Sequence, residues 1–122
     1  MGIRILVVDD HRNTRDALAL GLALLAIDVR TAASAAEAML ALEQYACDWL
    51  VCDVRMPVMD GIELVTRVNA ARPEVRLILM TAYDVSPDEQ ARIAAAGAQL
   101  LIKPVTAEAV VRRCREASRA GG

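Results

Sequence analysis

Two kinds of hydrophobic pattern alternate along the chain. Short runs in which most residues are apolar occur at residues 3–8, 49–52, 76–80 and 100–102, and we expect a further strand at residues 28–31. Runs of this length without regular polar alternation are typical of strands covered on both faces of a sheet. Between them lie longer stretches whose apolar residues are three or four positions apart. This spacing predicts helices over residues 12–26, 35–45, 61–71, 87–96 and 107–119.

Capping residues stand at several of the expected helix ends. Ser34 and Ser86 each precede a predicted helix and have a glutamate three positions later, which is the spacing of a capping box. Pro87 follows the second of these caps, at a position where proline favours a helix start. Asp60 can cap the third helix, and Gly97 stands where a left-handed residue would end the fourth.

Strands that alternate with helices in this way predict a parallel sheet with right-handed crossovers. For one domain of 122 residues, the most economical arrangement is an α/β fold with a doubly wound, five-stranded parallel sheet. We expect the flavodoxin-like strand order 2-1-3-4-5, with helices on both faces. An eight-fold barrel would need about twice the length. We expect residues 1–119 to form the domain and residues 120–122 to form a flexible tail or the start of a linker.

The composition is that of a folded domain. Hydrophobic residues make up 56% of the chain and charged residues 25%, which excludes a disordered segment. A net charge of −2 gives no reason to expect nucleic acid or an anionic membrane as a partner. Because no apolar run could span a bilayer and the start lacks a signal-peptide layout, we expect a cytoplasmic protein. Three widely spaced cysteines predict reduced thiols, two of them packed as apolar groups.

Residues with chemical potential follow the carboxyl ends of the predicted strands, where ligands bind in folds of this type. They are Asp9, Asp10, Asp53, Thr81, Ala82 and Lys103. Clustered carboxylates repel one another unless a cation joins them, and hard oxygen ligands suit Mg²⁺. The one lysine of the chain and a hydroxyl group could hold phosphoryl oxygens opposite the carboxylates. A carboxylate nucleophile in such surroundings can form an aspartyl phosphate.

Four motifs resemble those of the receiver domain of two-component response regulators. They are Val7-Val8-Asp9-Asp10, the D-x-x-M-P-x-x-x-G segment at residues 53–61, Thr81-Ala82 and Lys103-Pro104. Their order and spacing match over the entire chain. The resemblance implies that Asp53 accepts a phosphoryl group from a sensor histidine kinase or a phosphotransfer protein. It also implies that phosphorylation changes a partner-binding surface around the fourth helix, the fifth strand and the fifth helix.

The same resemblance implies a Mg²⁺ cofactor. Asp10 would be a direct ligand and Asp9 would act through water. Asp53 and the backbone carbonyl of Arg55 would complete the protein ligands. His11 follows the acidic pair, and we interpret it as the start of a helix rather than as a metal ligand.

The resemblance also implies which residues bind the phosphoryl group. Thr81, the backbone amide of Ala82 and Lys103 would each bind a phosphoryl oxygen, and the bond between Lys103 and Pro104 would be cis. Where the family often has an aromatic residue three positions before the lysine, this chain has Leu100. Transmission of the signal by an aromatic rotamer is therefore not expected.

Two positions near the acceptor affect phosphoryl loss in the family. They are occupied by Arg55 and Tyr83, which either shield the phosphoryl group from water or face solvent. The shielding hypothesis predicts comparatively slow hydrolysis. Partners beyond the kinase would be an output domain or a downstream protein, and a homodimer could form on phosphorylation. We expect this domain itself to contact neither nucleic acid nor membrane.

Two alternative functions compete with the switch. An aspartyl-nucleophile phosphatase typically has a second acid two residues after the nucleophile, but Arg55 occupies that position. We therefore expect no turnover of an external substrate, only assistance to the domain's own phosphorylation and dephosphorylation. A degenerate receiver that binds partners constitutively is supported by Leu100 alone.

Overall fold

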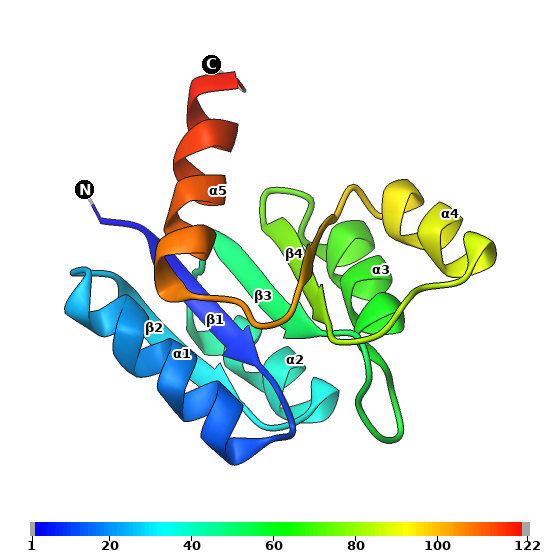
Figure 1. Cartoon of the computed structure of the whole chain (residues 1–122), viewed down its shortest axis with the longest axis horizontal. Helices are drawn as coiled ribbons and strands as arrows, with labels where there is room; N and C mark the ends of the chain where they lie inside the picture. Colours follow the sequence, from blue (N-terminus) through cyan, green and yellow to red (C-terminus); the bar gives the residue numbers. More distant parts are fainter. Residues whose placement is uncertain (1, 121–122) are drawn as a thin grey trace.

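The structure, a computed structural model, describes residues 2–120 (Figure 1). Strands and helices alternate through this part of the chain in the order β1 (Arg4–Val8), α1 (Arg12–Leu24), β2 (Asp28–Ala32), α2 (Ala35–Gln44), β3 (Trp49–Asp53), α3 (Gly61–Ala71), β4 (Arg76–Thr81), α4 (Pro87–Ala95), β5 (Gln99–Ile102) and α5 (Ala107–Ala120). Helix α5 thus reaches the first of the three residues that we assigned to a tail. Residues 121 and 122, the rest of that segment, lie outside the described residues.

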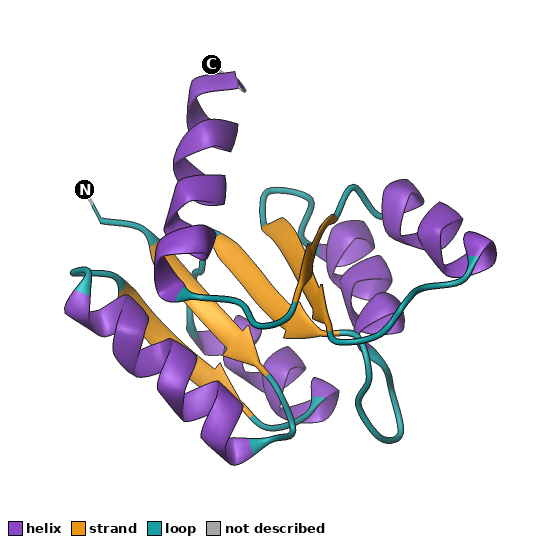
Figure 2. Ribbon diagram, in the orientation of Figure 1, coloured by secondary structure: helices purple, strands orange, loops and turns teal. Residues whose placement is uncertain are grey.

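The strands form one parallel sheet in the order β2-β1-β3-β4-β5, which confirms the predicted topology. Helices α1 and α5 pack on one face of the sheet, and α2, α3 and α4 pack on the other (Figure 2). Alternate residues of a central strand serve the two layers. Leu50 and Cys52 of β3 belong to the core under α2–α4, whereas Trp49 and Val51 belong to the core under α1 and α5.

The expectation that strands are covered on both faces holds only for the centre of the sheet. Every residue of β3 is buried, and so are all but the first residues of β1 and β4. Strands β2 and β5 lie at the two edges and are largely exposed or half-buried. Asp28 and Arg30 of β2 are charged and exposed, as is common on edge strands. Leu100 of β5 is half-buried and packs against the core under α2–α4.

Helix α4 ends at Ala95, one residue before its predicted end, and two other helices also end early. Helix α1 ends at Leu24 rather than at residue 26, because Ala26 adopts a left-handed backbone with a φ of 63°. Helix α2 ends at Gln44 because Tyr45 turns out of the helix, and its hydroxyl donates a hydrogen bond to the Asp28 carbonyl at 2.8 Å. In both cases apolar residues continue the helical spacing past the point where the backbone leaves the helix.

The predicted caps are present. The Ser86 side chain accepts from the Glu89 N–H while the Glu89 carboxylate accepts from the Ser86 N–H, a complete capping box. Ser34 also caps its helix, but the Glu37 carboxylate accepts from the N–H of Ala33 instead of from that of Ser34. The Asp60 side chain caps α3, and Gly97 has the expected left-handed backbone, with a φ of 72°.

All three cysteines are buried, one more than predicted. Burial is the main cause that raises the pKa of Cys47 to about 11 and that of Cys114 to about 12, and it also raises the pKa of Cys52. The thiols therefore act as small apolar groups at neutral pH. In the part of the chain that the structure describes, no helix has the length and apolar character needed to cross a membrane.

Candidate functional site

Strand register brings the acidic residues together at one edge of the sheet. Val8 pairs with Cys52 across β1 and β3, so Asp9 and Asp53 come next to each other at the carboxyl ends of adjacent parallel strands. Asp9 is fully buried and Asp53 is 4% exposed. Asp10 follows at the start of the loop and is half-buried.

The opposite side of this edge supplies the lysine and the threonine. Thr81 pairs with Ile102 across β4 and β5, so Lys103 follows directly beyond the paired strands. The Lys103 ammonium lies 3.0 Å from Asp53 Oδ1 and 3.2 Å from Asp9 Oδ2. The peptide bond between Lys103 and Pro104 is cis, as the family resemblance implied. One ammonium group is thus shared by two buried carboxylates.

Charge at this edge is only partly balanced. Burial raises the pKa of Asp53, and the neighbouring carboxylates of Asp9 and Asp10 raise it further, while Lys103 opposes the shift without cancelling it. Burial lowers the pKa of Lys103, but its hydrogen bonds and its attraction to Asp53 and Asp9 outweigh this effect, so the pKa is raised overall. The site holds Lys103 firmly charged and would gain from a further positive charge.

The acidic residues fit a divalent cation. Donor atoms of Asp9, Asp10, His11 and Asp53 all lie within 4.8 Å of one another. Among the described residues, the Asp10 Oδ1 atom is buried and has no hydrogen-bond partner. A buried carboxylate oxygen without a donor is costly, and carboxylate oxygens are the ligands that Mg²⁺ prefers.

Thr81 faces the loop that follows β4. Its side chain is buried, accepts a hydrogen bond from the Tyr83 N–H at 3.2 Å and donates one to the Tyr83 carbonyl at 3.0 Å. Ala82 is exposed at the start of the same loop. Ala82 and Lys103 also line a hollow of about 520 Å³ between α1 and the loop before α5. The hydroxyl that we expected to bind a phosphoryl oxygen is therefore engaged with the backbone of this loop.

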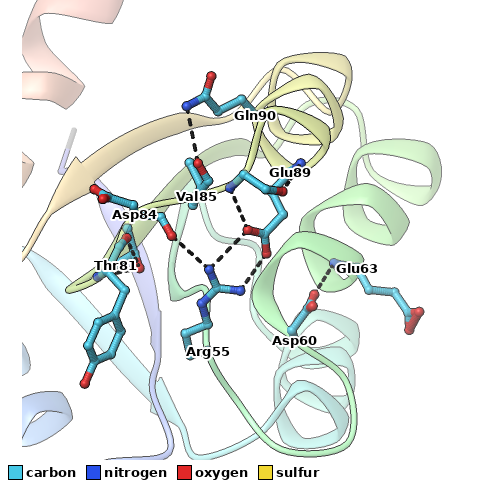
Figure 3. A network of polar contacts seen from close by, with 10 residues as sticks. Arg55, Asp60, Glu63, Thr81, Asp84, Val85, Glu89 and Gln90 are labelled. Carbon is cyan, nitrogen blue, oxygen red and sulfur yellow. Dashed lines mark hydrogen bonds and ion pairs between the residues drawn. The ribbon is translucent and has the colours of Figure 1, made fainter.

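The Arg55 side chain is held by α4 and by the loop before it. Its guanidinium donates to both carboxylate oxygens of Glu89 on α4, at 2.5 and 3.1 Å, and to the Asp84 carbonyl at 3.2 Å (Figure 3). Tyr83 is 71% exposed. The bidentate pair raises the pKa of Arg55 and is the main cause that lowers the pKa of Glu89 to about 2. Tyr83 therefore faces solvent, as one of the two alternatives required, whereas Arg55 pairs with Glu89, which neither alternative had predicted.

Glu89 is a residue whose role the sequence did not reveal. It is 34 positions from Arg55, and its place in a capping box already explained its charge. One carboxylate serves both purposes, because Glu89 Oε1 also accepts from the Ser86 N–H at 2.9 Å. The network therefore joins the segment after Asp53 to the first turn of α4.

Gly61 explains why the segment after Asp53 ends in glycine. A Cβ atom at this position would overlap the backbone carbonyl of Asp53 and crowd the side chain of Leu79. The Gly61 N–H donates to the Val54 carbonyl at 2.9 Å, which folds the loop back onto β3. Close backbone approach at Gly61 therefore fixes the position of the predicted acceptor.

Comparisons with known proteins agree with this geometry. A family model described as the response regulator receiver domain matches residues 5–115. Transcriptional regulatory protein PrrA of Mycobacterium tuberculosis is 36% identical over 110 residues, which cover 89% of this chain and 47% of PrrA. Response regulator MprA of Mycobacterium ulcerans is 32% identical over 115 residues, covering 94% of this chain and 50% of MprA. The chain thus spans about half the length of the curated relatives that it matches.

Solved structures show the same architecture. A CheY-like response regulator receiver domain protein from Methanospirillum hungatei JF-1 superposes with a TM-score of 0.88 at 28% identity, covering 95% of this chain and 93% of that protein. Chemotaxis protein CheY4 of Vibrio cholerae superposes with a TM-score of 0.85, also at 28% identity, covering 95% and 98% of the two chains.

Proposed function

The chain belongs to the response regulator receiver domain family, and we propose on that premise that it is a switch in which Asp53 accepts a phosphoryl group. Receiver domains act in signalling rather than in turnover of a substrate. The observation that carries the proposal is the 3.0 Å contact between Lys103 Nζ and Asp53 Oδ1 inside an acidic edge. A buried carboxylate beside one fixed cation is suited to attack phosphorus and to have the new phosphoryl oxygens neutralised.

The phosphoryl donor would be a sensor histidine kinase or a phosphotransfer protein. An Asp53 oxygen forms a bond to phosphorus as the bond from phosphorus to the donor's imidazole nitrogen breaks. Lys103 holds one phosphoryl oxygen by its ammonium group, and the Ala82 N–H offers a second donor. Thr81 can donate to a third oxygen only if its hydroxyl leaves the Tyr83 carbonyl.

The oxygen donors at this edge would hold Mg²⁺. Asp10 and Asp53, the Arg55 carbonyl and Asp9 through water form the proposed ligand set. When bound, the ion supplies positive charge beside the phosphoryl oxygens. The buried Asp10 Oδ1, which makes no hydrogen bond to the described residues and has the His11 imidazole at ion-pair distance, supports this assignment. Any assistance to dephosphorylation would use the same residues.

The signal would leave the site through the loop after β4. Reorientation of the Thr81 hydroxyl breaks its bond to Tyr83, and that loop continues to the Arg55–Glu89 contact at the start of α4. Leu100 on β5 has no polar group to join this change, so backbone movement replaces an aromatic switch. The surface of α4, β5 and α5 would then bind an output domain, a downstream protein or a second phosphorylated copy.

The wider setting belongs to the same proposal. PrrA is named a transcriptional regulatory protein, so an output domain that controls transcription is the partner we propose for the full-length protein. This domain itself would contact no nucleic acid and would act in the cytoplasm.

Intact mass after incubation with acetyl phosphate and Mg²⁺ tests the proposal. We expect one phosphoryl adduct in the unaltered protein and in Asp16→Asn, a control at an exposed aspartate of α1. Asp53→Asn should give none, and neither should samples without Mg²⁺. A folded wild-type protein that forms no adduct would contradict the switch and favour constitutive binding of partners. Release of inorganic phosphate over many turnovers would instead indicate a phosphatase.

A further inference from the structure

His11 lies against the acidic edge in a way that its role as a helix start does not explain. It is the N-cap residue of α1, but its side chain makes no capping hydrogen bond. Its Nδ1 atom instead lies 3.3 Å from Asp10 Oδ1 and 3.4 Å from Asp9 Oδ1. The side chain is 69% exposed, so burial does not force the imidazole into this position.

The spacing of these atoms is that of neighbouring ligands on one metal ion. Ligand atoms at bond lengths of 2.0–2.1 Å lie about 3.3–3.4 Å apart around a tetrahedral ion and about 3 Å apart around an octahedral one. The 3.3 Å between His11 Nδ1 and Asp10 Oδ1 falls at the tetrahedral value, the geometry that Zn²⁺ adopts. Asp10 Oδ1, the nearer atom, is the buried oxygen that lacks a hydrogen-bond partner.

Asp9 is less available than Asp10. Its Oδ1 accepts from the His11 N–H at 2.9 Å, and its Oδ2 accepts from Lys103 at 3.2 Å. Asp9 therefore orients its neighbours, while His11 and Asp10 keep donor atoms that can face an ion. Asp53 adds a carboxylate oxygen to the same cluster.

We propose that His11 is a ligand of this cation site and gives it a preference for Zn²⁺, and for other ions that take imidazole nitrogen such as Ni²⁺, over Mg²⁺. The inference rests on the proposed function, because it assigns a further ligand to the same site. Imidazole nitrogen suits nickel and zinc, whereas Mg²⁺ takes oxygen ligands and keeps several waters. A transition-metal ion would therefore use His11 together with Asp10 and Asp53, and Mg²⁺ would gain little from His11.

The composition of the chain makes this assignment testable. His11 is its single histidine. The three cysteines are buried, and burial raises the pKa values of Cys47 and Cys114 to about 11 and about 12, so thiolate ligands are scarce at neutral pH. His11 is therefore the one imidazole ligand that this chain can offer to Ni²⁺.

Calorimetric titration of the full chain with Ni²⁺ alone and with Mg²⁺ alone tests the proposal. We expect Ni²⁺ to bind more tightly than Mg²⁺, and His11→Ala to weaken Ni²⁺ binding by roughly tenfold or more while changing Mg²⁺ binding by less than about threefold. Asn13→Ala, in the same helical turn, is the matched control and should change neither. Ring ¹⁵N signals of the single histidine should shift with Zn²⁺, a diamagnetic ion, and not with Mg²⁺.

Two results of the titrations would overturn the proposal. Equal Ni²⁺ affinity in the wild type and His11→Ala would overturn the proposal, and so would equal losses for Ni²⁺ and Mg²⁺. The acetyl phosphate assay on the unaltered protein with Mg²⁺ keeps the two proposals separate, because its outcome involves no transition-metal ion. A missing adduct in the wild type would count against the switch, whereas an unchanged Ni²⁺ titration would count only against His11 as a ligand.

Discussion

Two polar regions meet at the carboxyl end of β3, and they balance their charges differently. On one side, Asp9 and Asp53 share the ammonium group of Lys103, and the pKa of Asp53 remains raised. On the other side, Arg55 and Glu89 form a bidentate pair, and the pKa of Glu89 falls to about 2. The first region has too little positive charge and the second has enough.

This difference indicates what each region does. Buried carboxylates with too few partners destabilise the fold, and such a cost is typical of a site that a ligand completes. An exposed, fully paired network contributes little to stability but fixes the position of the segments that it joins. The difference therefore supports the proposal of phosphoryl and cation chemistry at the acidic edge, whereas the Arg55–Glu89 pair joins the segment after Asp53 to α4.

Among the substitutions that distinguish the two regions, removal of the Lys103 charge should change the free energy of unfolding most. Lys103→Met leaves Asp9 and Asp53 buried without their cation, so we expect the free energy of unfolding at pH 7 to fall by roughly 3 kcal/mol. Arg67→Met is the matched control, because Arg67 pairs with Glu63 on the exposed surface of α3. It should cost less than about 1 kcal/mol. Urea unfolding measures both, and equal losses would remove the contrast between buried and exposed pairs.

Asp10→Asn should have a smaller effect of opposite sign. It removes one negative charge from the region that has too many, so in the presence of a chelator we expect the free energy of unfolding to rise by about 1 kcal/mol. The same change should abolish any stabilisation by Mg²⁺. Asp16→Asn, on the exposed surface of α1, controls for the loss of a carboxylate in general. Lower stability of metal-free Asp10→Asn would show that hydrogen bonds or Lys103 already compensate the cluster.

Much of the fold was predictable because local patterns and the sheet agree. Uninterrupted apolar runs such as 49–52 are buried on both faces, and caps at Ser86 and Asp60 lie where helices begin. The meeting of the candidate site residues followed from topology, since polar residues after parallel strands must lie at one edge of the sheet. Hydrophobic spacing predicted the wrong helix end where the backbone conformation determines it. An example is Ala26, whose left-handed conformation ends α1.

The rest depended on contacts that no local pattern encodes. Arg55 and Glu89 lie far apart in sequence, and each had a sufficient local explanation, so their pairing was not expected. The exposure of β2 follows from its place at the sheet edge, a place that its charged residues Asp28 and Arg30 already indicate. His11 was interpreted as a helix start, and it is one; the approach of its imidazole to Asp10 appears only in three dimensions.

The two regions should also respond to pH in opposite directions, which is the finest test of the comparison. The pKa of Glu89 is lowered to about 2 from an ordinary value of 4.5, so its pair with Arg55 stabilises the fold above that ordinary value. This stabilisation is lost as the pH falls toward 2. Glu89→Gln keeps a side chain that suits a capping box but removes the charge. At pH 7 the variant should therefore have a lower free energy of unfolding than the wild type, and this difference should shrink as the pH falls to 3. Urea unfolding at the two pH values measures the change, which should be smaller than the effects of Lys103→Met and Asp10→Asn.

Asp53 has the reverse sign. Its pKa is raised above the ordinary 3.8, so the folded, metal-free protein binds a proton that the unfolded chain releases, and stability falls as the pH rises through this window. As the pH rises, the free energy of unfolding of metal-free Asp53→Asn should thus increase relative to that of the wild type. That of Glu89→Gln should decrease relative to the wild type over the same range. Glu63→Gln, which removes a carboxylate at the corresponding position of α3, should follow neither trend. If both variants changed with pH in the same direction, the acidic edge would already be as well balanced as the Arg55 network, and the case for an additional cation would weaken.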